Sequence, residues 1–542
     1  MQFVAQRRSV NNQSPKRREG ALVKVLLPLL ALAILGFLMA CGGGPPITPP
    51  PPAGNFSNAS LKGQYAFLMN GIDTNGAYLA RIGSFTADGA GNITAGLEDV
   101  VSLGTGGPPS LISFTGGNYQ IQSNGRGLIV LQAASGGGLQ LNAALESSGA
   151  GFLVQTDLSA TSSGSFYLQT NTAFSTSSLL NHFVFDFSGL SFVSSAVAPL
   201  SLVGEINFDG SGKITQGVMD TNDGNATAPS GATAVSPGTY ALDSGANGTS
   251  FGRGTMAFNG RSYAFYIVNS TRVLVLEEDS LGGSAGQALR QASTIPLRNS
   301  DFTGSFAYLV AGAQVTGNQG PVALAARFTA DGNGNLNSIS MDYNNDGNYT
   351  HASSGSASSY SIDTANAGSG RGTFTFNASP GIFSNVFYMI SSAQADVQQT
   401  SLSIVGDGPF YSQSGGPFTV AETAASYAFN WSGTQLGSST AVPFQEHFTG
   451  LYTLSNASSN NIAGVVDYVE LGLSSNQLFT NIGVGGMLAV NGDGTANNLY
   501  KFAIGGPSST TINFQAYFVS PTTVLLVCSD SARTTAGLAV QQ

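Results

Sequence analysis

The chain has 542 residues, of which only 9% are charged, and its formal net charge is −10. A hydrophobic fraction of 42% supplies enough apolar surface to build folded cores and excludes a disordered chain. The acidic balance repels phosphate backbones and argues against a nucleic-acid partner. With only two cysteines, a disulfide framework and a cysteine metal site are both excluded.

The N-terminal segment is predicted to be an export signal. Six cations precede an apolar run over residues 25–40, and the segment ends in Leu38-Met39-Ala40-Cys41. A charged region, an apolar region and a small residue in this order are typical of a cleaved secretory signal. These last four residues form a lipobox, and the chain here resembles the bacterial lipoproteins processed by signal peptidase II.

That resemblance implies removal of residues 1–40 and acylation of Cys41. We therefore expect an exported protein held by lipid on a membrane, at the outer membrane or cell surface, with the lipid bilayer as its first partner. The alternative is an uncleaved membrane anchor. Against it, the 16-residue apolar run is shorter than the ~20 residues that span a bilayer core.

A spacer is predicted over residues 41–60. Three glycines follow Cys41, and six prolines lie between Pro45 and Pro52. Such a proline-rich stretch favours stiff polyproline II backbone.

Four β repeats of about 120 residues are predicted after the spacer, over residues 61–175, 176–298, 299–418 and 419–542. An aromatic opening strand recurs at Tyr65, Phe183, Phe306 and Tyr427, in steps of 118, 123 and 121 residues. A turn of the form Asp-Gly-x-Gly follows at Asp88, Asp209 and Asp331, whereas the fourth repeat is degenerate. A period this long indicates a whole domain in each repeat.

Within a repeat, apolar and polar residues alternate with period two, which is typical of half-buried antiparallel strands. Residues 61–175 contain about eight such strands joined by tight turns. We therefore predict an all-β protein of four eight-stranded up-and-down barrels, similar to lipocalins or avidin, with β-sandwiches as the alternative. The chain resembles multi-repeat all-β surface lipoproteins of environmental bacteria, a resemblance that implies no activity.

Charged residues recur at fixed places in the repeats. The aspartates are Asp99, Asp220, Asp342 and Asp467, and the arginines are Arg126, Arg253 and Arg371. We predict a structural ion pair inside each unit, joining Arg126 to Asp99, Arg253 to Asp220 and Arg371 to Asp342, because guanidinium and carboxylate fit each other bidentately. The alternative is a polar ligand site at the rim of each barrel.

A calcium site is a second interpretation of one of these segments. Asp342, Asn344 and Asp346 are followed by Gly347, which matches the first half of an oxygen-rich calcium loop. The competing interpretation is a hairpin turn built from Asn, Asp and Gly.

No catalytic residue is assigned. Gly248–Gly252 has the spelling of a nucleophile elbow, but the chain has only three histidines and they are scattered. Glu277, Glu278 and Asp279 form a carboxylate run that could serve glycoside hydrolysis. The sequence thus predicts a non-catalytic surface module that binds an extracellular ligand or fills a structural role, without a cofactor other than calcium. A carbohydrate-active enzyme is the alternative.

Overall fold

The computed structural model describes residues 54–542 except 104–108, 194–195, 227, 318, 354–357, 367, 379–380, 437–443, 458–460, 472–475, 496–499 and 505–509. These residues belong to one compact unit of the chain. The predicted signal peptide, the lipobox with Cys41 and most of the spacer lie outside the described residues. Among the described residues, no helix has both the length and the apolar character needed to cross a membrane.

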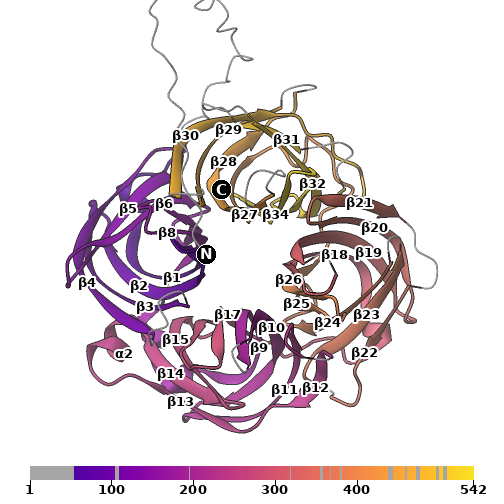
Figure 1. Ribbon diagram of the computed structural model, residues 1–542, viewed down its shortest axis with the longest axis horizontal. Helices are drawn as coiled ribbons and strands as arrows, with labels where there is room; N and C mark the ends of the chain where they lie inside the picture. The colour runs from indigo at the N-terminus through magenta and orange to yellow at the C-terminus, as the bar shows by residue number, and fades with distance from the viewer. Residues whose placement is uncertain are drawn as a thin grey trace, which may run out of the picture. The chain divides into compact units, whose positions relative to one another are not determined.

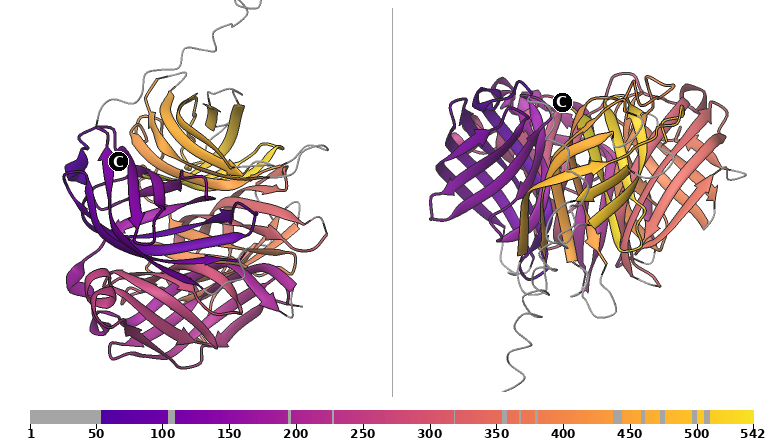
Figure 2. Two further views of the ribbon diagram at one scale, coloured as in Figure 1. Left: turned by 60° about the vertical axis from the view of Figure 1, so that its left-hand side comes forward. Right: turned by 90° about the horizontal axis from the view of Figure 1, so that it is seen from above.

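The all-β prediction is confirmed: the described chain forms four antiparallel sheets in sequence order. Helical segments are short, namely η1 (Asn58–Ser60), η2 (Asn171–Ala173), η3 (Thr176–Ser178), α2 (Ala246–Phe251) and η4 (Asn299–Asp301). We call the four sheets units 1 to 4. Figure 1 shows the strands of each unit curving around their own centre, and Figure 2 shows how the strands tilt.

Unit 1 is a closed barrel of eight strands, each paired with its neighbour in sequence and the last with the first. Its strands are β1 (Lys62–Asp73), β2 (Tyr78–Asp88), β3 (Asn92–Ser102), β4 (Ser110–Ile121), β5 (Arg126–Ala133), β6 (Gly138–Leu145), β7 (Ala150–Gln155) and β8 (Ala160–Leu168). This up-and-down order confirms the predicted barrel.

Unit 2 has nine strands, because two short strands, β12 and β13, stand where unit 1 has β4. The strands are β9 (Leu180–Val193), β10 (Ala196–Asp209), β11 (Lys213–Asp223), β12 (Ser230–Ala234), β13 (Gly238–Leu242), β14 (Arg253–Phe258), β15 (Arg261–Asn269), β16 (Arg272–Glu277) and β17 (Gly282–Arg290). Because β10 pairs with both β9 and β11, the first strand of the sheet order is also hydrogen-bonded to a strand near its other end.

Unit 3 repeats this division of the fourth strand, and its sheet has β21 and β22 as its two edges. Its strands are β18 (Thr303–Gln314), β19 (Gly320–Asp331), β20 (Leu336–Asn345), β21 (Asn348–Ser353), β22 (Ser359–Ile362), β23 (Arg371–Ala378), β24 (Gly381–Met389), β25 (Gln394–Gln399) and β26 (Ile404–Ser412).

Unit 4 is again a closed barrel of eight strands. They are β27 (Ser426–Gln435), β28 (Phe444–Leu454), β29 (Ile462–Leu471), β30 (Asn476–Gly486), β31 (Tyr500–Ile504), β32 (Thr510–Ser520), β33 (Thr523–Cys528) and β34 (Arg533–Gln541). The unit that looks degenerate in sequence therefore keeps the strand order of unit 1.

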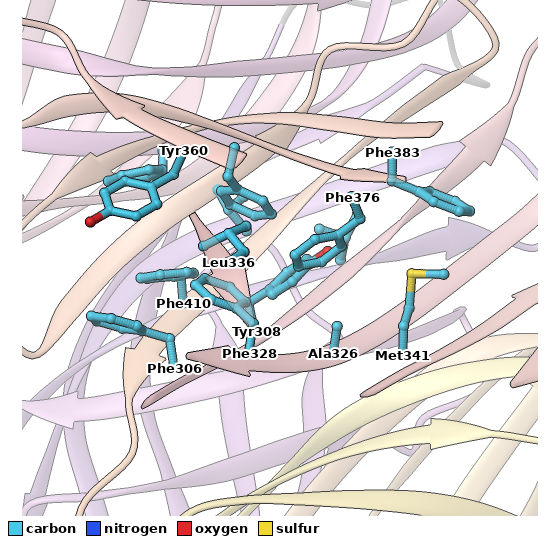
Figure 3. Packing of buried hydrophobic residues seen from close by; sticks show 14 of the residues in the cluster. Phe306, Tyr308, Ala326, Phe328, Leu336, Met341, Tyr360, Phe376, Phe383 and Phe410 are labelled. Atoms are coloured by element: carbon cyan, nitrogen blue, oxygen red, sulfur yellow. The ribbon is translucent and has the colours of Figure 1, made fainter. Parts of the chain in front are cut away.

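Each sheet encloses a core of aromatic and aliphatic side chains. In unit 3, Phe306, Phe328 and Phe410 have ring centroids 5.2–5.8 Å apart, and Figure 3 shows these rings pointing toward one another. Trp431 is fully buried in the core of unit 4. The packed rings fill the interior of the sheet, as the inward-facing residues of small barrels do.

A tyrosine closes one end of units 1, 2 and 3. The hydroxyls of Tyr119, Tyr240 and Tyr360 each donate to two backbone carbonyls of the 3₁₀ turn before the opening strand, at 2.8–3.1 Å. These residues are 121 and 120 positions apart, so the repeat period applies to them as well.

The recurring Asp-Gly-x-Gly segments are hairpin turns, as predicted. In the first, Asp88 Oδ1 accepts from the backbone N–H of Ala90 at 2.6 Å and of Asn92 at 3.0 Å. Gly89 and Gly91 have φ of +84° and +113°, a region that favours glycine. The hydrogen bonds from Asn92 and Ala90 lower the pKa of Asp88 to about 2.

Candidate functional site

The recurring arginines bind the recurring aspartates of a neighbouring unit, and Arg253 and Arg371 also pair with Asp243 and Asp363 of their own unit. Between units 1 and 2, Arg253 Nε and Nη2 donate to the two oxygens of Asp99 at 2.8 and 2.7 Å. Between units 2 and 3, Arg371 makes the same bidentate contact with Asp220, both at 2.8 Å. Between units 4 and 1, Arg126 Nη2 pairs with Asp467.

This corrects the predicted pairs Arg126–Asp99, Arg253–Asp220 and Arg371–Asp342 inside each unit. In a barrel, Asp99 on β3 and Arg126 on β5 are separated by the whole of β4, which is roughly 10 Å of sheet. Side chains on the outer face meet the outer face of another unit instead. The recurring arginines and aspartates do form ion pairs, but with partners other than those predicted.

The aspartates of these ion pairs are buried, and two of them, Asp99 and Asp220, also accept from a tyrosine. The side chains of Arg253 and Asp99 are 9% and 1% exposed. The Tyr266 hydroxyl donates to Asp99 at 2.8 Å, and Tyr388 does the same to Asp220 at 2.6 Å. Burial lowers the pKa of Arg253, but the hydrogen bonds and charges of Asp99 and Asp243 together outweigh this and leave that pKa above its ordinary value.

Among the described residues, no arginine side chain of unit 4 pairs with Asp342 of unit 3. Thr495 stands at the position of the recurring arginine, because it lies opposite Tyr517 as Arg253 lies opposite Tyr266. Asp342 of unit 3 instead accepts from the hydroxyl of Tyr517 at 2.5 Å, from the hydroxyl of Tyr349, and contacts His351 Nδ1 at 2.9 Å. Hydrogen bonding to Asp342 raises the pKa of His351.

A glutamine at the end of each unit makes the same contact in all four cases. Gln169 Nε2 donates to the carbonyls of Phe251 and Ile267 in unit 2, at 3.0 and 2.6 Å. The equivalents are Gln291 to Ser369 and Met389, Gln413 to Asp493 and Phe518, and Gln542 to Asn124 and Leu145. Since Gln542 of unit 4 binds unit 1, the four contacts form a closed cycle.

Each carbonyl pair occupies an equivalent place in the fold. The first carbonyl of each pair belongs to the residue just before a glycine, which is Gly252, Gly370, Gly494 or Gly125. The second carbonyl belongs to the residue whose backbone N–H donates to the carbonyl of the same glycine. Apolar clusters lie beside these polar contacts, for example Ile82 and Leu97 of unit 1 against Leu274 and Leu276 of unit 2. The four units are therefore held by one repeated contact, which combines polar and apolar groups.

The glutamines and tyrosines of these contacts were missed by the sequence analysis. The glutamines at 169, 291 and 413 are 122 residues apart, so the repeat period contained the information. Single polar residues recurring at a fixed step are a weaker pattern than the Asp-Gly turns, which have local turn chemistry.

The predicted calcium segment is part of a hairpin. Asp342 and Asn344 lie in β20, and Asp346-Gly347 form its two-residue turn with φ of +50° and +79°, as in a type I′ turn. Asn344 Nδ2 donates to the carbonyls of Cys528 and Arg533 at 2.8 Å. Asp342 and Asn344 are thus engaged with protein groups. Over the part of the chain that the structure describes, no group of three or more His, Cys, Asp or Glu residues is arranged to hold a metal ion.

The carboxylate run lies at the end of β16. Glu277 contacts Arg261 and accepts from Ser284 Oγ at 2.7 Å, and Glu278 lies 3.3 Å from Arg253. Burial raises the pKa of Glu277, and burial together with Asp99 raises the pKa of Glu278 to about 7. These acids therefore belong to ion-pair networks of unit 2 and of its contact with unit 1.

Ser250 of the elbow-like segment lies in the short helix α2, and its carbonyl accepts from Gln64 Nε2 at 2.5 Å. A different serine lies beside a histidine: Ser163 Oγ is 2.7 Å from His447 Nδ1. Both side chains are buried, and burial lowers the pKa of His447 to about 3. A buried neutral histidine packed between units 1 and 4 is a structural contact.

A surface recess of about 880 Å³ lies beside the segment that joins units 2 and 3. Its lining includes His182, Arg290, Thr271 and Ile295. His182 Nδ1 is 2.5 Å from Glu205 Oε1, and this hydrogen bond raises the pKa of His182. At the positions equivalent to His182 and Arg290, the other units have only uncharged residues, namely Gln64 and Leu168, Ser305 and Ser412, and Ser426 and Gln541.

No protein-family model matches the chain, and no curated protein does. Among solved structures, a double mutant of the vaccine antigen Transferrin Binding Protein B from Haemophilus parasuis is similar over 73% of this chain and 83% of that chain. The sequence identity is 8% and the TM-score is 0.18. This distant likeness assigns neither a family nor a function to the chain.

Proposed function

We propose that the chain is a lipid-anchored, non-catalytic surface module whose four β units act together as one scaffold for binding extracellular material. The anchor rests on the lipobox, with Cys41 as the acylated residue. The scaffold rests on the repeated contact between units. Export would place the units outside the cytoplasm, at the outer membrane or cell surface.

The proposal rests mainly on the four recurring aspartates, which are buried at the contacts between units. Asp99, Asp220, Asp342 and Asp467 are each no more than 3% exposed, and each accepts hydrogen bonds at a contact between units. Repeated carboxylates that bind protein groups are not free to bind four equivalent ligands. Repetition here builds a scaffold, and a binding site is expected where the units differ.

The recess beside Arg290 is the place where we expect a ligand. Arg290 supplies positive charge in an otherwise acidic protein, His182 supplies an imidazole group that is paired with Glu205, and Thr271, Ser293 and Thr294 supply hydroxyl groups. An acidic glycan offers the matching carboxylate and hydroxyl groups.

The anchoring is tested with Cys41→Ala, expressed in a bacterium that processes lipoproteins and labelled with radioactive palmitate. The unchanged protein should carry the label, sediment with membranes and begin at residue 41. The variant should lose the label, while Cys528→Ala, a buried thiol outside the lipobox, should keep it. A labelled Cys41→Ala variant would overturn the anchor.

The binding function is tested with the detergent-solubilised protein on immobilised oligogalacturonate and on a neutral glycan of the same length. We expect salt-sensitive binding to the acidic glycan, weakened at least tenfold by Arg290→Gln. Release of shortened glycan by the protein, abolished by Glu277→Gln, would favour the carbohydrate-active enzyme instead. Equal binding of both glycans would refute the recess as the ligand site.

A further inference from the structure

The contact between units 2 and 3 contains three carboxyl groups that its sister contacts lack. They are Asp186 of β9, Asp396 of β25 and Asp407 of β26. The registers of the sheets identify the sister residues. The counterparts of Asp186 are Leu68, Leu309 and Asn430. The counterparts of Asp396 are Leu274, Leu525 and Phe152. The counterparts of Asp407 are Ala285, Ala536 and Ser163.

These carboxyl groups lie in a buried polar network that joins the two units. Gln398 is opposite Asp407 in the sheet, and its Nε2 donates to the carbonyl and the Oγ of Ser201 in unit 2, at 2.8 and 2.7 Å. Asp396 is 3% exposed and Asp407 is 9% exposed. Ser201 and Ser188 lie opposite each other in unit 2, and both lower the pKa of Asp407.

The network has more acceptors than donors. Within the described residues, Asp186 Oδ1, Asp396 Oδ2, Asp407 Oδ2 and Gln398 Oε1 have no hydrogen-bond partner. Four buried oxygens of this kind are costly unless something donates to them. A proton on a carboxyl group turns an acceptor into a donor, so protonation balances the network without any further ligand.

Burial and mutual repulsion favour that protonation. Burial, followed by the charge of Asp407, raises the pKa of Asp396 to about 7. Burial raises the pKa of Asp407 to about 6, although Ser201 and Ser188 oppose the shift. Burial and then the charges of Asp407 and Asp396 raise the pKa of Asp186.

The charged and titratable groups around the cluster do not neutralise it. Arg272 lowers the pKa of Asp396, but its guanidinium also lies 4.1 Å from the ring centroid of Tyr167. The other facing groups are Tyr78 and Glu146 of unit 1, Glu277 of unit 2 and Tyr411 of unit 3. A cavity of about 170 Å³, lined by Asp186, Asn70 and Tyr167, lies beside the cluster and gives water a route to it.

We propose that the contact between units 2 and 3 is a proton-dependent joint, closed when Asp186, Asp396 and Asp407 hold protons and loosened when they ionise. Ionisation puts like charges into a buried space where the sister contacts have only uncharged residues, mostly leucine, alanine or phenylalanine. The other three contacts lack these acids and keep the units connected while this one opens.

The direction of the pH dependence follows from the raised pKa values. The closed contact keeps protons that an exposed carboxyl group, with a pKa near 3.9, releases. The contact is therefore most stable below about pH 4, and its stability falls as the pH rises through about 6 and 7. Between the pKa of an exposed carboxyl group and the raised pKa values, each proton released on opening makes the opening constant rise by about tenfold per pH unit.

The test is hydrogen exchange of the full-length protein between pH 5 and pH 8, corrected for the intrinsic pH dependence of exchange. Peptides covering β25 report on the joint, and peptides covering β33, its counterpart in the contact between units 3 and 4, provide the internal reference. We expect opening at β25 to rise at least tenfold more than at β33.

The matched variant is Asp186→Asn, Asp396→Asn and Asp407→Asn together, which keeps the shape of the protonated side chains but cannot ionise. It should abolish the extra rise at β25. If the triple variant does not fold, Asp396→Leu, which introduces the residue of the sister positions, should reduce the rise on its own. Asp88→Asn, at an exposed turn, should leave it unchanged. A flat profile in the unchanged protein, or a rise that persists in the variants, would overturn the proposal.

Discussion

The contact between units 1 and 2 and the contact between units 3 and 4 each bury an aspartate, but different groups donate to it. Both contain the glutamine that donates to two carbonyls, and both contain a buried aspartate that accepts from a tyrosine. Arg253 completes the first contact, whereas Thr495 occupies the equivalent position in the second. There, Tyr349 and His351 of unit 3 itself contact Asp342.

The acceptor is therefore the fixed element of this contact, and its donors can change. A buried carboxylate needs hydrogen bonds to replace its lost hydration, but these can come from the other unit or from its own. A bidentate arginine carries a full charge and couples two units tightly. Neutral hydroxyl groups satisfy the carboxylate while avoiding the burial of a second charge.

The largest expected effect is that of Arg253→Ala. The change leaves Asp99, which is 1% exposed, without its charged partner, so the free energy of unfolding should fall by about 3–5 kcal/mol in urea denaturation. Thr495→Ala is the matched control at the contact between units 3 and 4, and it should cost less than about 1 kcal/mol. Equal losses in the two variants would remove the distinction between the contacts.

A smaller effect is expected when a glutamine shared by all contacts is removed. Gln291→Ala deletes hydrogen bonds of 2.9 and 2.8 Å to the buried contact with unit 3, which should cost about 2 kcal/mol. Gln319→Ala, whose amide donates only to an exposed local carbonyl, is the control and should leave urea denaturation unchanged. No loss in Gln291→Ala would mean that the repeated contact does not depend on these hydrogen bonds.

The smallest effect separates the histidine-containing contact from the arginine-containing ones. The pKa of His351 is raised, so its protonated form stabilises the fold below its ordinary pKa near 6.5, and this contribution is lost as the pH rises through the raised value. Because the His351 side chain is 53% exposed, we expect less than about 1 kcal/mol.

The measurement is the free energy of unfolding of the unchanged protein and of His351→Gln at pH 6 and pH 9. The stability advantage of the unchanged protein should be larger at pH 6. An advantage that grows toward pH 9 would contradict the assigned sign.

The repeat period and the strand alternation were sufficient to predict the four all-β units, because turn residues and apolar faces are local properties of the sequence. They also indicated that Arg253 and Asp99 are structural residues. They did not distinguish Asp220 from Asp99 as the partner of Arg253, because the repeated units present an aspartate at the same position. Only the packing of outer faces decides between a contact within a unit and a contact across units.

In the calcium motif, one sequence pattern is compatible with two different local structures. Asp342, Asn344 and Asp346 have the spacing of cation ligands, but the same letters encode a type I′ turn and a contact with unit 4. Sequence spacing specifies which oxygens could converge, whereas burial against Tyr517 and Thr534 decides what they bind.

The closed cycle formed by Gln169, Gln291, Gln413 and Gln542 has a consequence for cleavage of the chain. Every unit is held by two neighbours, and the junction of units 4 and 1 depends on side-chain and backbone contacts without a short connecting peptide. A protease that cuts one of the segments between sheets thus breaks a covalent link, but each fragment remains in non-covalent contact with the other at both of its terminal units. Nicked protein should co-purify as a complex, and separately expressed halves should reassemble.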